Sequence, residues 1–411
     1  MAHERKNMEL IKVAIVFVVI LVLLNKRLPL FLGMLAGTVL LVLFFGIDIM
    51  TALTTGGQSM IAWSTWEVVI ALYVITLLQR TLEKRQHLQL AQNSLNGLIK
   101  DRRFNAGLAS VFIGMMPSAA AVTICGQIMD DTAGKYLTKE EKAFCATYYR
   151  HLPEGVLPTF PLIIIACTLS GVPVGSFLLV MLPMVAVLFA LGFLFYLRKV
   201  PKVDAESASV NQNISKAENL KNLAKSLWTI FFAILVIIVF GLPTWLAVVG
   251  VILVSIFVNK FKPEELKEMV ISAFEWKPLL GTIFVFVFKD MLVATGLLEI
   301  LPDYFAMLPI PAFLTLALLF FFGTLVASST AVGSAFIPLA FSMIPDGGVV
   351  LLVLLMGFSY AAAQMSPTHV CLAVIMEYFG VTMGSVIKKT LPVVGSYCVI
   401  LLGYYLLIGL F

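Results

Sequence analysis

The chain has 411 residues, of which 60% are hydrophobic and only 12% charged, and its mean hydropathy is +1.01. A soluble domain is nearer half apolar and a quarter charged, so this composition excludes an ordinary soluble fold and predicts an all-α membrane protein with room for about a dozen spans of roughly 20 residues. The formal net charge of +5 says little by itself, because the placement of the basic residues carries the topological information.

Apolar runs recur in two groups of six, separated by a polar segment at 198–225 that is rich in Ser, Asn, Glu and Lys and reads as a linker. No small-residue cleavage site follows the first run, so we interpret it as a retained span. We divide the chain into a first repeat at 1–197, a cytoplasmic linker at 198–225 and a second repeat at 226–411. The runs are Met8–Leu24, Leu28–Phe45, Trp66–Leu78, Ala106–Met129, Phe144–Ser170 and Ser176–Tyr196, then Ser226–Phe240, Thr244–Val258, Leu279–Leu297, Ala312–Ile344, Val349–Met376 and Leu391–Leu410.

Nearly all Lys and Arg fall in alternate loops, and assigning those loops to the cytoplasm satisfies the positive-inside rule. Arg5, Lys6 and Lys12 are the exceptions, and Lys12 is near enough to a span end to snorkel. The assignment requires Ala106–Met129, which has basic residues at both ends, and Ala312–Ile344, which has them at neither, to enter and leave on the same side. Each is therefore predicted to be a re-entrant hairpin. Each repeat then crosses five times, so the two repeats have inverted topology and both termini are external.

The two repeats are also related in sequence. After a shift of 209 positions, residues 158–183 align without a gap on residues 367–392, and eight of the 26 pairs are identical. Inverted repeats are typical of secondary transporters, which hold the substrate near the midplane between broken helices. Charge pattern and internal similarity thus independently predict one duplication.

The two hairpin tips are the first candidate sites, because their small and hydroxyl residues allow close approach of the main chain. Hydroxyl groups and helix N-termini suit a carboxylate or phosphate, and free carbonyls suit sodium. The alternative is that these small residues only let the helices pack closely. The candidate residues are Ser118 and Thr123 in the first hairpin and Ser328, Ser329 and Thr330 in the second.

The other candidate sites are two helices that prolines should interrupt, Phe144–Ser170 and Val349–Met376. Ionisable groups at such depth are expensive and favour a functional interpretation. An arginine fork suits a carboxylate, and histidines suit proton coupling. Alternatively, Arg150 and Glu154 only neutralise each other at i,i+4, and the histidines bind main-chain carbonyls. The candidate residues are Arg150, His151, Glu154 and Thr159 in the first helix and Gln364, Ser366, Thr368 and His369 in the second.

The remaining charges and thiols are expected to be structural. Lys289 and Asp290 lie in the middle of an apolar run, so both charges need partners within the protein. A structural ion pair is expected. Glu67 and an anionic substrate are the alternative partners for Lys289. Asp130 and Asp131 are interfacial. The five cysteines fall in or beside apolar stretches without metal-ligand spacing, and the four histidines are dispersed, so no metal site or other cofactor is expected beyond a possible coupling sodium ion or proton.

Two segments carry a resemblance to a known family: Tyr149–Pro161, with its Arg-His-Leu-Pro-Glu-Gly sequence, and Gln364–Phe379, with Ser-Pro-Thr-His-Val-Cys-Leu. They resemble a prokaryotic integral-membrane family, domain of unknown function 401, of the ion transporter superfamily. That superfamily includes the large permease of tripartite dicarboxylate transporters, gluconate and citrate permeases, and sodium/proton antiporters. The resemblance implies paired hairpins, broken helices, organic-anion or cation substrates and a homodimer, with an auxiliary solute-binding subunit as a further option. The first hairpin departs from it, because Met-Pro-Ser-Ala-Ala-Ala stands at 116–121 where a Pro-Met-Pro-Gly-Gly-like run is expected.

The sequence therefore predicts a multi-pass inner-membrane protein that carries a small organic anion, coupled to sodium or protons, by alternating access. Its partners would be lipid and a small solute, not nucleic acid. A sodium/proton antiporter is the main alternative, followed by a passive channel and an intramembrane enzyme. No protease signature or ATP-binding loop is present in the sequence, which disfavours an enzyme or an ATP-driven pump.

Overall fold

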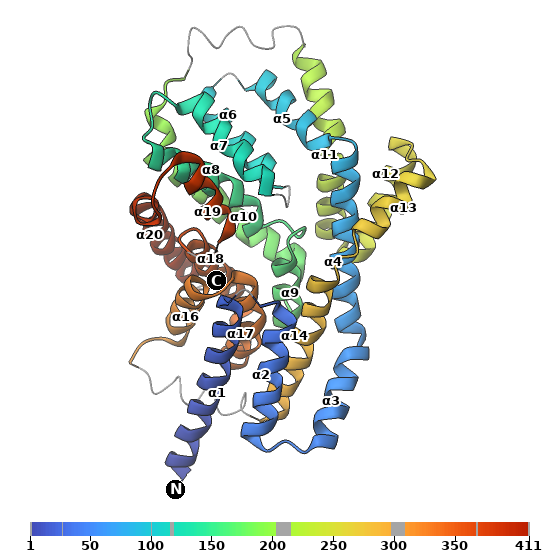
Figure 1. Cartoon of the computed structure of the whole chain (residues 1–411), viewed down its shortest axis with the longest axis vertical. Helices are drawn as coiled ribbons and strands as arrows, with labels where there is room; N and C mark the ends of the chain where they lie inside the picture. Colours follow the sequence, from blue (N-terminus) through green and yellow to red (C-terminus); the bar gives the residue numbers. More distant parts are fainter. Residues whose placement is uncertain are drawn as a thin grey trace. The chain divides into compact units, whose positions relative to one another are not determined.

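The computed structural model describes residues 2–26, 28–99, 101–115, 119–202, 215–296, 309–366 and 369–409, which form helices joined by short loops, with no strand among them (Figure 1). The all-α class is confirmed. The first half contains α1 (Ala2–Asn25), α2 (Leu30–Phe45), α3 (Ile49–Ile61), α4 (Trp63–Lys84), α5 (His87–Leu98), α6 (Arg102–Gly114), α7 (Ala119–Ala133), α8 (Lys139–His151), η1 (Leu152–Gly155), α9 (Pro161–Ser170), α10 (Val174–Phe195) and η2 (Leu197–Lys199). The second half contains α11 (Lys216–Phe240), α12 (Thr244–Asn259), α13 (Pro263–Ser272), α14 (Trp276–Ala294), α16 (Ala312–Val326), α17 (Ser329–Met343), η4 (Pro345–Gly347), α18 (Gly348–Ala363), α19 (Val370–Phe379) and α20 (Met383–Ile408).

Within the described part of the chain, five helices are long and apolar enough to cross a membrane: α4, α10, α11, the η4–α18 segment and α20. A sixth span results if α13 and α14, which meet at a bend of 48°, are taken together. Shorter apolar helices of 10–17 residues, among them α2, α9, α12, α16, α17 and α19, occupy most of the other predicted runs. The chain is thus a multi-pass helical membrane protein.

Each of the four runs predicted to be a hairpin or an interrupted helix is divided into separate helices. α6 and α7 pack on each other, as do α16 and α17. Phe144–Ser170 is divided into α8, η1 and α9, and Val349–Met376 is divided into α18 and α19. The prolines at 153 and 161 stand in the first turns of η1 and α9, where a missing amide hydrogen costs nothing.

Segments assigned to loops by their polarity are in part helical, so those boundaries were wrong. α3 fills most of 46–62 because the Asp48 carboxylate caps it, accepting from the Met50 and Thr51 amides at 3.0 and 3.1 Å. α5 and α13 occupy the basic loops at 80–103 and 260–277. The last ten residues of the predicted linker form the first turns of α11, which Ser215 caps. A polar stretch of sequence indicates exposure to water. The polar face of an amphipathic helix is exposed as a loop is, so polarity alone does not distinguish the two.

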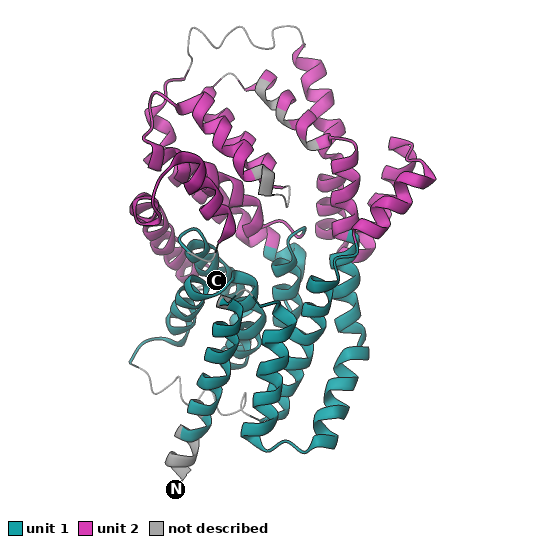
Figure 2. Cartoon of the chain, in the orientation of Figure 1, with its two compact units in different colours: residues 1–74, 159–177, 274–368 teal, residues 75–158, 178–273, 369–411 magenta. Residues whose placement is uncertain are grey.

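Two compact units are present, each built from three separate stretches of chain (Figure 2). Unit 1 comprises residues 1–74, 159–177 and 274–368. In it, α17 packs on α9, α16 packs on α18, and α14 packs on α2 and α3. α18 is buried from Leu351 to Ala362 and apolar all round, as expected of a helix enclosed by others.

Unit 2 comprises residues 75–158, 178–273 and 369–411. Its centre is α8, which is buried from Glu141 to His151 and packs against α6, α7, α19 and α20. The buried Tyr148 and Tyr149 hydroxyls donate to main-chain carbonyls of α10, those of Leu188 and Phe189. These contacts hold the end of α8, where the helix is interrupted, inside the unit.

Candidate functional site

The best-formed candidate site lies in unit 2, where α8 ends and α19 begins. The capping box of Thr138 and Glu141 starts α8, and the helix stops at His151, one residue before the 3-10 turn that contains Pro153. Arg150 and His151 are therefore the last side chains of a buried helix, with relative exposures of 4% and 2%. Ending the helix there places a permanent cation and an imidazole inside the protein, where both need partners.

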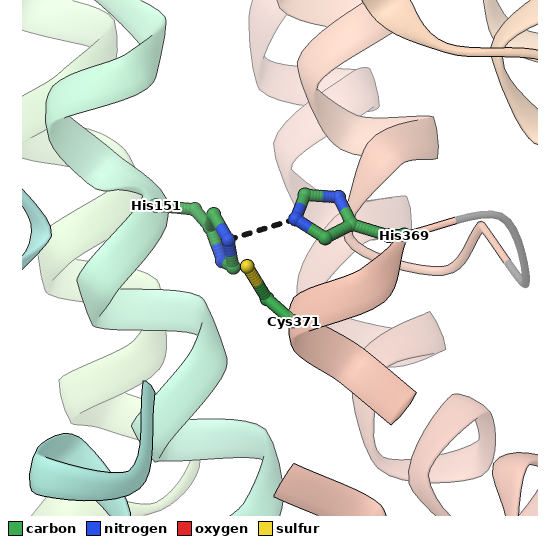
Figure 3. A group of neighbouring side chains, drawn as sticks. All are labelled: His151, His369 and Cys371. Atoms are coloured by element: carbon green, nitrogen blue, oxygen red, sulfur yellow. Dashed lines mark hydrogen bonds between the residues drawn. The ribbon is translucent and has the colours of Figure 1, made fainter. Parts of the chain in front are cut away.

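Those partners come from α19, more than 200 residues further along the chain. The Nε2 atoms of His151 and His369 lie 2.9 Å apart, and their rings are nearly perpendicular, at 78° (Figure 3). Nη1 of Arg150 donates to His151 Nε2 at 2.9 Å and to Cys371 Sγ at 3.3 Å. The predicted site residues Arg150, His151 and His369 thus meet, joined by Cys371.

The remaining ring nitrogen of His151 fixes the protonation pattern. Nδ1 of His151 is 2.5 Å from the Thr147 carbonyl oxygen. A carbonyl only accepts, so Nδ1 carries a hydrogen, and in the neutral ring Nε2 is an acceptor. His369 Nε2 and Arg150 Nη1 then both direct hydrogens at one lone pair, that of His151 Nε2.

Glu154, in η1, completes the cluster. Its Oε1 lies 3.6 Å from Arg150 Nη1 and 3.7 Å from His151 Nε2, and its side chain is 31% exposed. The predicted i,i+4 pairing with Arg150 is present as a loose ion pair. The cluster therefore holds one permanent cation, one carboxylate, two imidazoles and one thiol.

The second hairpin and the second interrupted helix meet in unit 1. Ser328 caps α17, its hydroxyl accepting from the Ala331 amide at 3.2 Å. Ser366 donates to the Leu325 carbonyl at 3.1 Å, at the end of α16. The Thr324 and Ser359 hydroxyls are 2.8 Å apart, so hydrogen bonds tie the hairpin to both α18 and the segment after it.

A cavity of about 410 Å³ in unit 1 includes one predicted tip residue, Thr330. Its other lining is mostly apolar, with Lys277 and Thr282 as further polar contributions and Pro161, at the start of α9, on its wall. Ser329 begins α17, Gln364 is buried just after α18, and Thr159 is half-buried between η1 and α9. Thr123 is half-buried on α7 in unit 2, while Ser118 and Thr368 lie outside the described residues.

Lys289, Asp130 and Lys12 each have an ion-pair or hydrogen-bonding partner within the chain. Lys289 pairs with its neighbour Asp290 at 2.8 Å, although adjacent residues on a helix point about 100° apart and that pairing was not required. Asp130 pairs with Lys142. Lys12 donates to the Phe44 carbonyl at 2.6 Å, at the end of α2.

Sequence reasoning missed two features. Three of the cysteines are buried as expected, but Cys371 is half-buried and hydrogen-bonded to Arg150. The second feature is the buried carboxylate of Glu141, which accepts from Lys199 at 2.8 Å and from Lys389 at 3.1 Å. Only its place in the capping box of α8 was visible in the sequence, because both lysines come from distant parts of the chain.

Comparison with known proteins adds a fold and a family. The crystal structure of the YdaH transporter of Alcanivorax borkumensis, described as having an unusual topology, superposes with a TM-score of 0.62 and 14% identity over 89% of each chain. At that identity the likeness shows the fold alone. A search of curated proteins found no match. The family model described as "Protein of unknown function (DUF401)" matches residues 9–408, so the chain belongs to the DUF401 family.

Proposed function

We propose that this protein is a secondary active transporter of a small organic anion, a carboxylate in the first instance, coupled to protons. It would work by alternating access in the inner membrane, as a homodimer. The observation that carries the proposal is the burial of Arg150 at a helix break, in hydrogen-bonding contact with the His151–His369 pair. The likeness in fold to a transporter agrees with it.

The anion preference follows from the charge of Arg150. A guanidinium stays protonated and offers a planar fork that matches a carboxylate. Its contacts at 2.9 and 3.3 Å are with a neutral imidazole and a thiol, and the carboxylate of Glu154 is further away, at 3.6 Å. A substrate carboxylate that displaced those neutral groups would gain a charge-assisted bond.

The histidine pair suggests how a proton could be coupled to the anion. A proton added to His151 Nε2 removes the acceptor that Arg150 Nη1 uses and places a second positive charge 2.9 Å from it. Both changes favour an anion at Arg150, and by reciprocity the anion favours the proton. Symport follows if the two cross together. Sodium coupling stays an alternative, with the main-chain carbonyls at the hairpin tips as its ligands.

Two inverted repeats, with ancestry in the ion transporter superfamily, form part of this proposal. The shift of 209 positions places the first residues of α8, α9 and α10 on those of α18, α19 and α20. It also places Arg150 on Ser359. Arg150 lies against Gly114 in α6, and Ser359 lies against Thr324 in α16, so each residue contacts the first helix of the hairpin in its own half. Moreover, α7 packs on α19 and α17 packs on α9. The second helix of each hairpin therefore packs on the corresponding helix of the other half. These correspondences support a duplication.

Arg150→Gln tests the function. Purified protein in proteoliposomes would be given labelled carboxylates under an imposed proton or sodium gradient. Loss of a charge-assisted hydrogen bond worth about 1.5–3 kcal/mol should weaken anion uptake roughly ten- to a hundred-fold. Arg198→Gln, at an exposed position in η2, is the matched control and should transport normally. Unchanged anion uptake by a well-folded Arg150→Gln protein would remove Arg150 from the site and favour the sodium/proton antiporter.

A further inference from the structure

Three donor atoms converge in unit 2 in the manner of metal ligands: one ring nitrogen each of His151 and His369 and Sγ of Cys371 lie within 4.8 Å of one another (Figure 3). His369 directly precedes α19 and Cys371 is the second residue of that helix, while His151 is the last residue of α8. Imidazole and thiolate together suit borderline and soft cations such as Zn²⁺, and disfavour Mg²⁺ and Ca²⁺.

We propose that His151, His369 and Cys371 form a binding site for a divalent transition-metal ion of the zinc class, with Glu154 as a fourth ligand. Its Oε1 is 3.7 Å from His151 Nε2, so a side-chain rotation brings it to the same centre. The thiolate and the carboxylate together supply two negative charges, which offset the charge of the ion.

The hydrogen bond behind His151 supports this assignment. Histidines that bind metals generally donate their other ring hydrogen to a carbonyl or carboxylate, which fixes the tautomer and aims the lone pair. The Thr147 carbonyl, at 2.5 Å from Nδ1, occupies that position. His151 is therefore held in the tautomer that presents Nε2 to the cluster.

The distances need only a small adjustment. With metal–nitrogen bonds of about 2.0–2.1 Å, the two nitrogens of a tetrahedral site lie roughly 3.3 Å apart. The two Nε2 atoms are 2.9 Å apart, so the imidazoles would separate by a few tenths of an ångström. Cys371 and Glu154 are half-buried, so the cluster is not wholly enclosed by protein.

Arg150 is the competitor for this site. Its Nη1 contacts His151 Nε2 and Cys371 Sγ, so a positively charged group already uses the lone pairs that an ion would need. Binding of the ion must displace the guanidinium, and repulsion between these two positive charges weakens that binding. Ion and coupling proton also compete for the same nitrogen, so binding of the ion would inhibit proton-coupled transport.

Cobalt titration of the full chain in detergent tests the site directly. We expect a single Co²⁺ per chain, with the visible bands of a tetrahedral site and a thiolate-to-cobalt charge-transfer band, both abolished by Zn²⁺. Cys371→Ser should lose the charge-transfer band. His369→Ala should weaken binding at least tenfold, since even substitutions outside the ligand set cost about 10–100-fold. The matched controls are Cys398→Ser, also half-buried, and His87→Ala, which should leave the spectrum unchanged.

Two further measurements keep the proposal falsifiable if those variants fold poorly. In the unmodified protein, Zn²⁺ should slow alkylation of Cys371 by N-ethylmaleimide, followed by mass spectrometry of the peptide. Arg150→Gln should bind Co²⁺ more tightly, by about tenfold or more, because it removes a like charge near the ion. No stoichiometric Co²⁺ binding by the wild-type protein, or unchanged Cys371 alkylation with Zn²⁺, would overturn the site. Neither result bears on anion uptake, so the two proposals fail separately.

Discussion

Gly114 lies against the main-chain carbonyl of Arg150, so closely that a β-carbon at position 114 would be 1.8 Å from that oxygen. The obstacle is main chain, which cannot rotate away as a side chain can. Gly114, the last residue of α6, thus fixes the main chain at Arg150, one residue before α8 ends. Any shift there would move the guanidinium of Arg150 relative to His369 and Cys371.

Gly114→Ala should therefore both destabilise the protein and disable the Arg150 cluster. Overpacking of a buried contact costs about 1–3 kcal/mol, and we expect the upper end because main chain must move. Thermal unfolding in detergent and Co²⁺ affinity are the measurements. The control is Gly250→Ala in α12, where an added β-carbon meets nothing within 4 Å and stability should be unchanged or higher. A Gly114→Ala protein of wild-type stability would contradict the close approach.

Glu141→Gln should loosen the start of α8. The Glu141 carboxylate is 6% exposed and holds Lys199 and Lys389, whose side chains are 44% and 35% exposed. Solvent screens these two lysines, so we expect the free energy of unfolding to fall by about 1–2 kcal/mol, which is less than the loss of a fully buried ion pair would cause. Glu140→Gln, one residue earlier and partly exposed, is the matched control. Equal melting temperatures for the two variants would show that the lysine contacts contribute nothing.

The same contribution should depend on pH in a defined direction. Burial raises the pKa of Glu141, but hydrogen bonds from Lys199, the Thr138 amide and Lys389 outweigh it and hold that pKa below its ordinary value of 4.5. A carboxyl with a lowered folded-state pKa stabilises the fold above its unfolded pKa, and the benefit is lost as pH falls through the folded value. The stability gap between wild type and Glu141→Gln should be full near neutral pH and shrink below about pH 4.5. A gap that widened on acidification would refute this sign.

Lys289 and Asp290 should behave as a structural pair. Their side chains are 27% and 32% exposed in an apolar helix, so Lys289→Met alone leaves a carboxylate without its cation. We expect a loss of about 1–3 kcal/mol, largely recovered in Lys289→Met/Asp290→Asn. Melting temperatures and carboxylate uptake of both variants provide the test. A stable double variant that no longer transports would place Lys289 on the substrate path instead.

Labelling of single introduced cysteines should reveal the inverted topology. Lys216→Cys lies at the start of α11 and Asp346→Cys in η4, and both positions are exposed. If the basic loops are cytoplasmic, a membrane-impermeant maleimide added to intact cells should label position 346 and spare position 216. The wild-type protein, with its native cysteines, gives the background. External labelling of position 216 would defeat the inverted-repeat proposal.

The sequence by itself determined the class and the places of the breaks. Hydropathy is summed over neighbouring residues, so it identifies membrane-spanning helices without knowledge of the fold. Prolines act on their own main chain, which is why the interruptions after His151 and after Ala363 were predictable. For the same reason, polarity alone misassigned α3 and α13, since local pattern does not distinguish an amphipathic helix from a loop.

The composition of the site was decided only by the tertiary structure. His151 and His369 are 218 positions apart, and nothing local distinguishes Cys371 from four other cysteines in apolar surroundings. Their meeting depends on α19, from the second half of the chain, packing against α7 and α8 of the first. Such packing is selected by shape and burial summed over many side chains, so no single motif encodes it. The groups that meet there set whether Arg150 faces a carboxylate, an imidazole or a thiol, and hence what the site can bind.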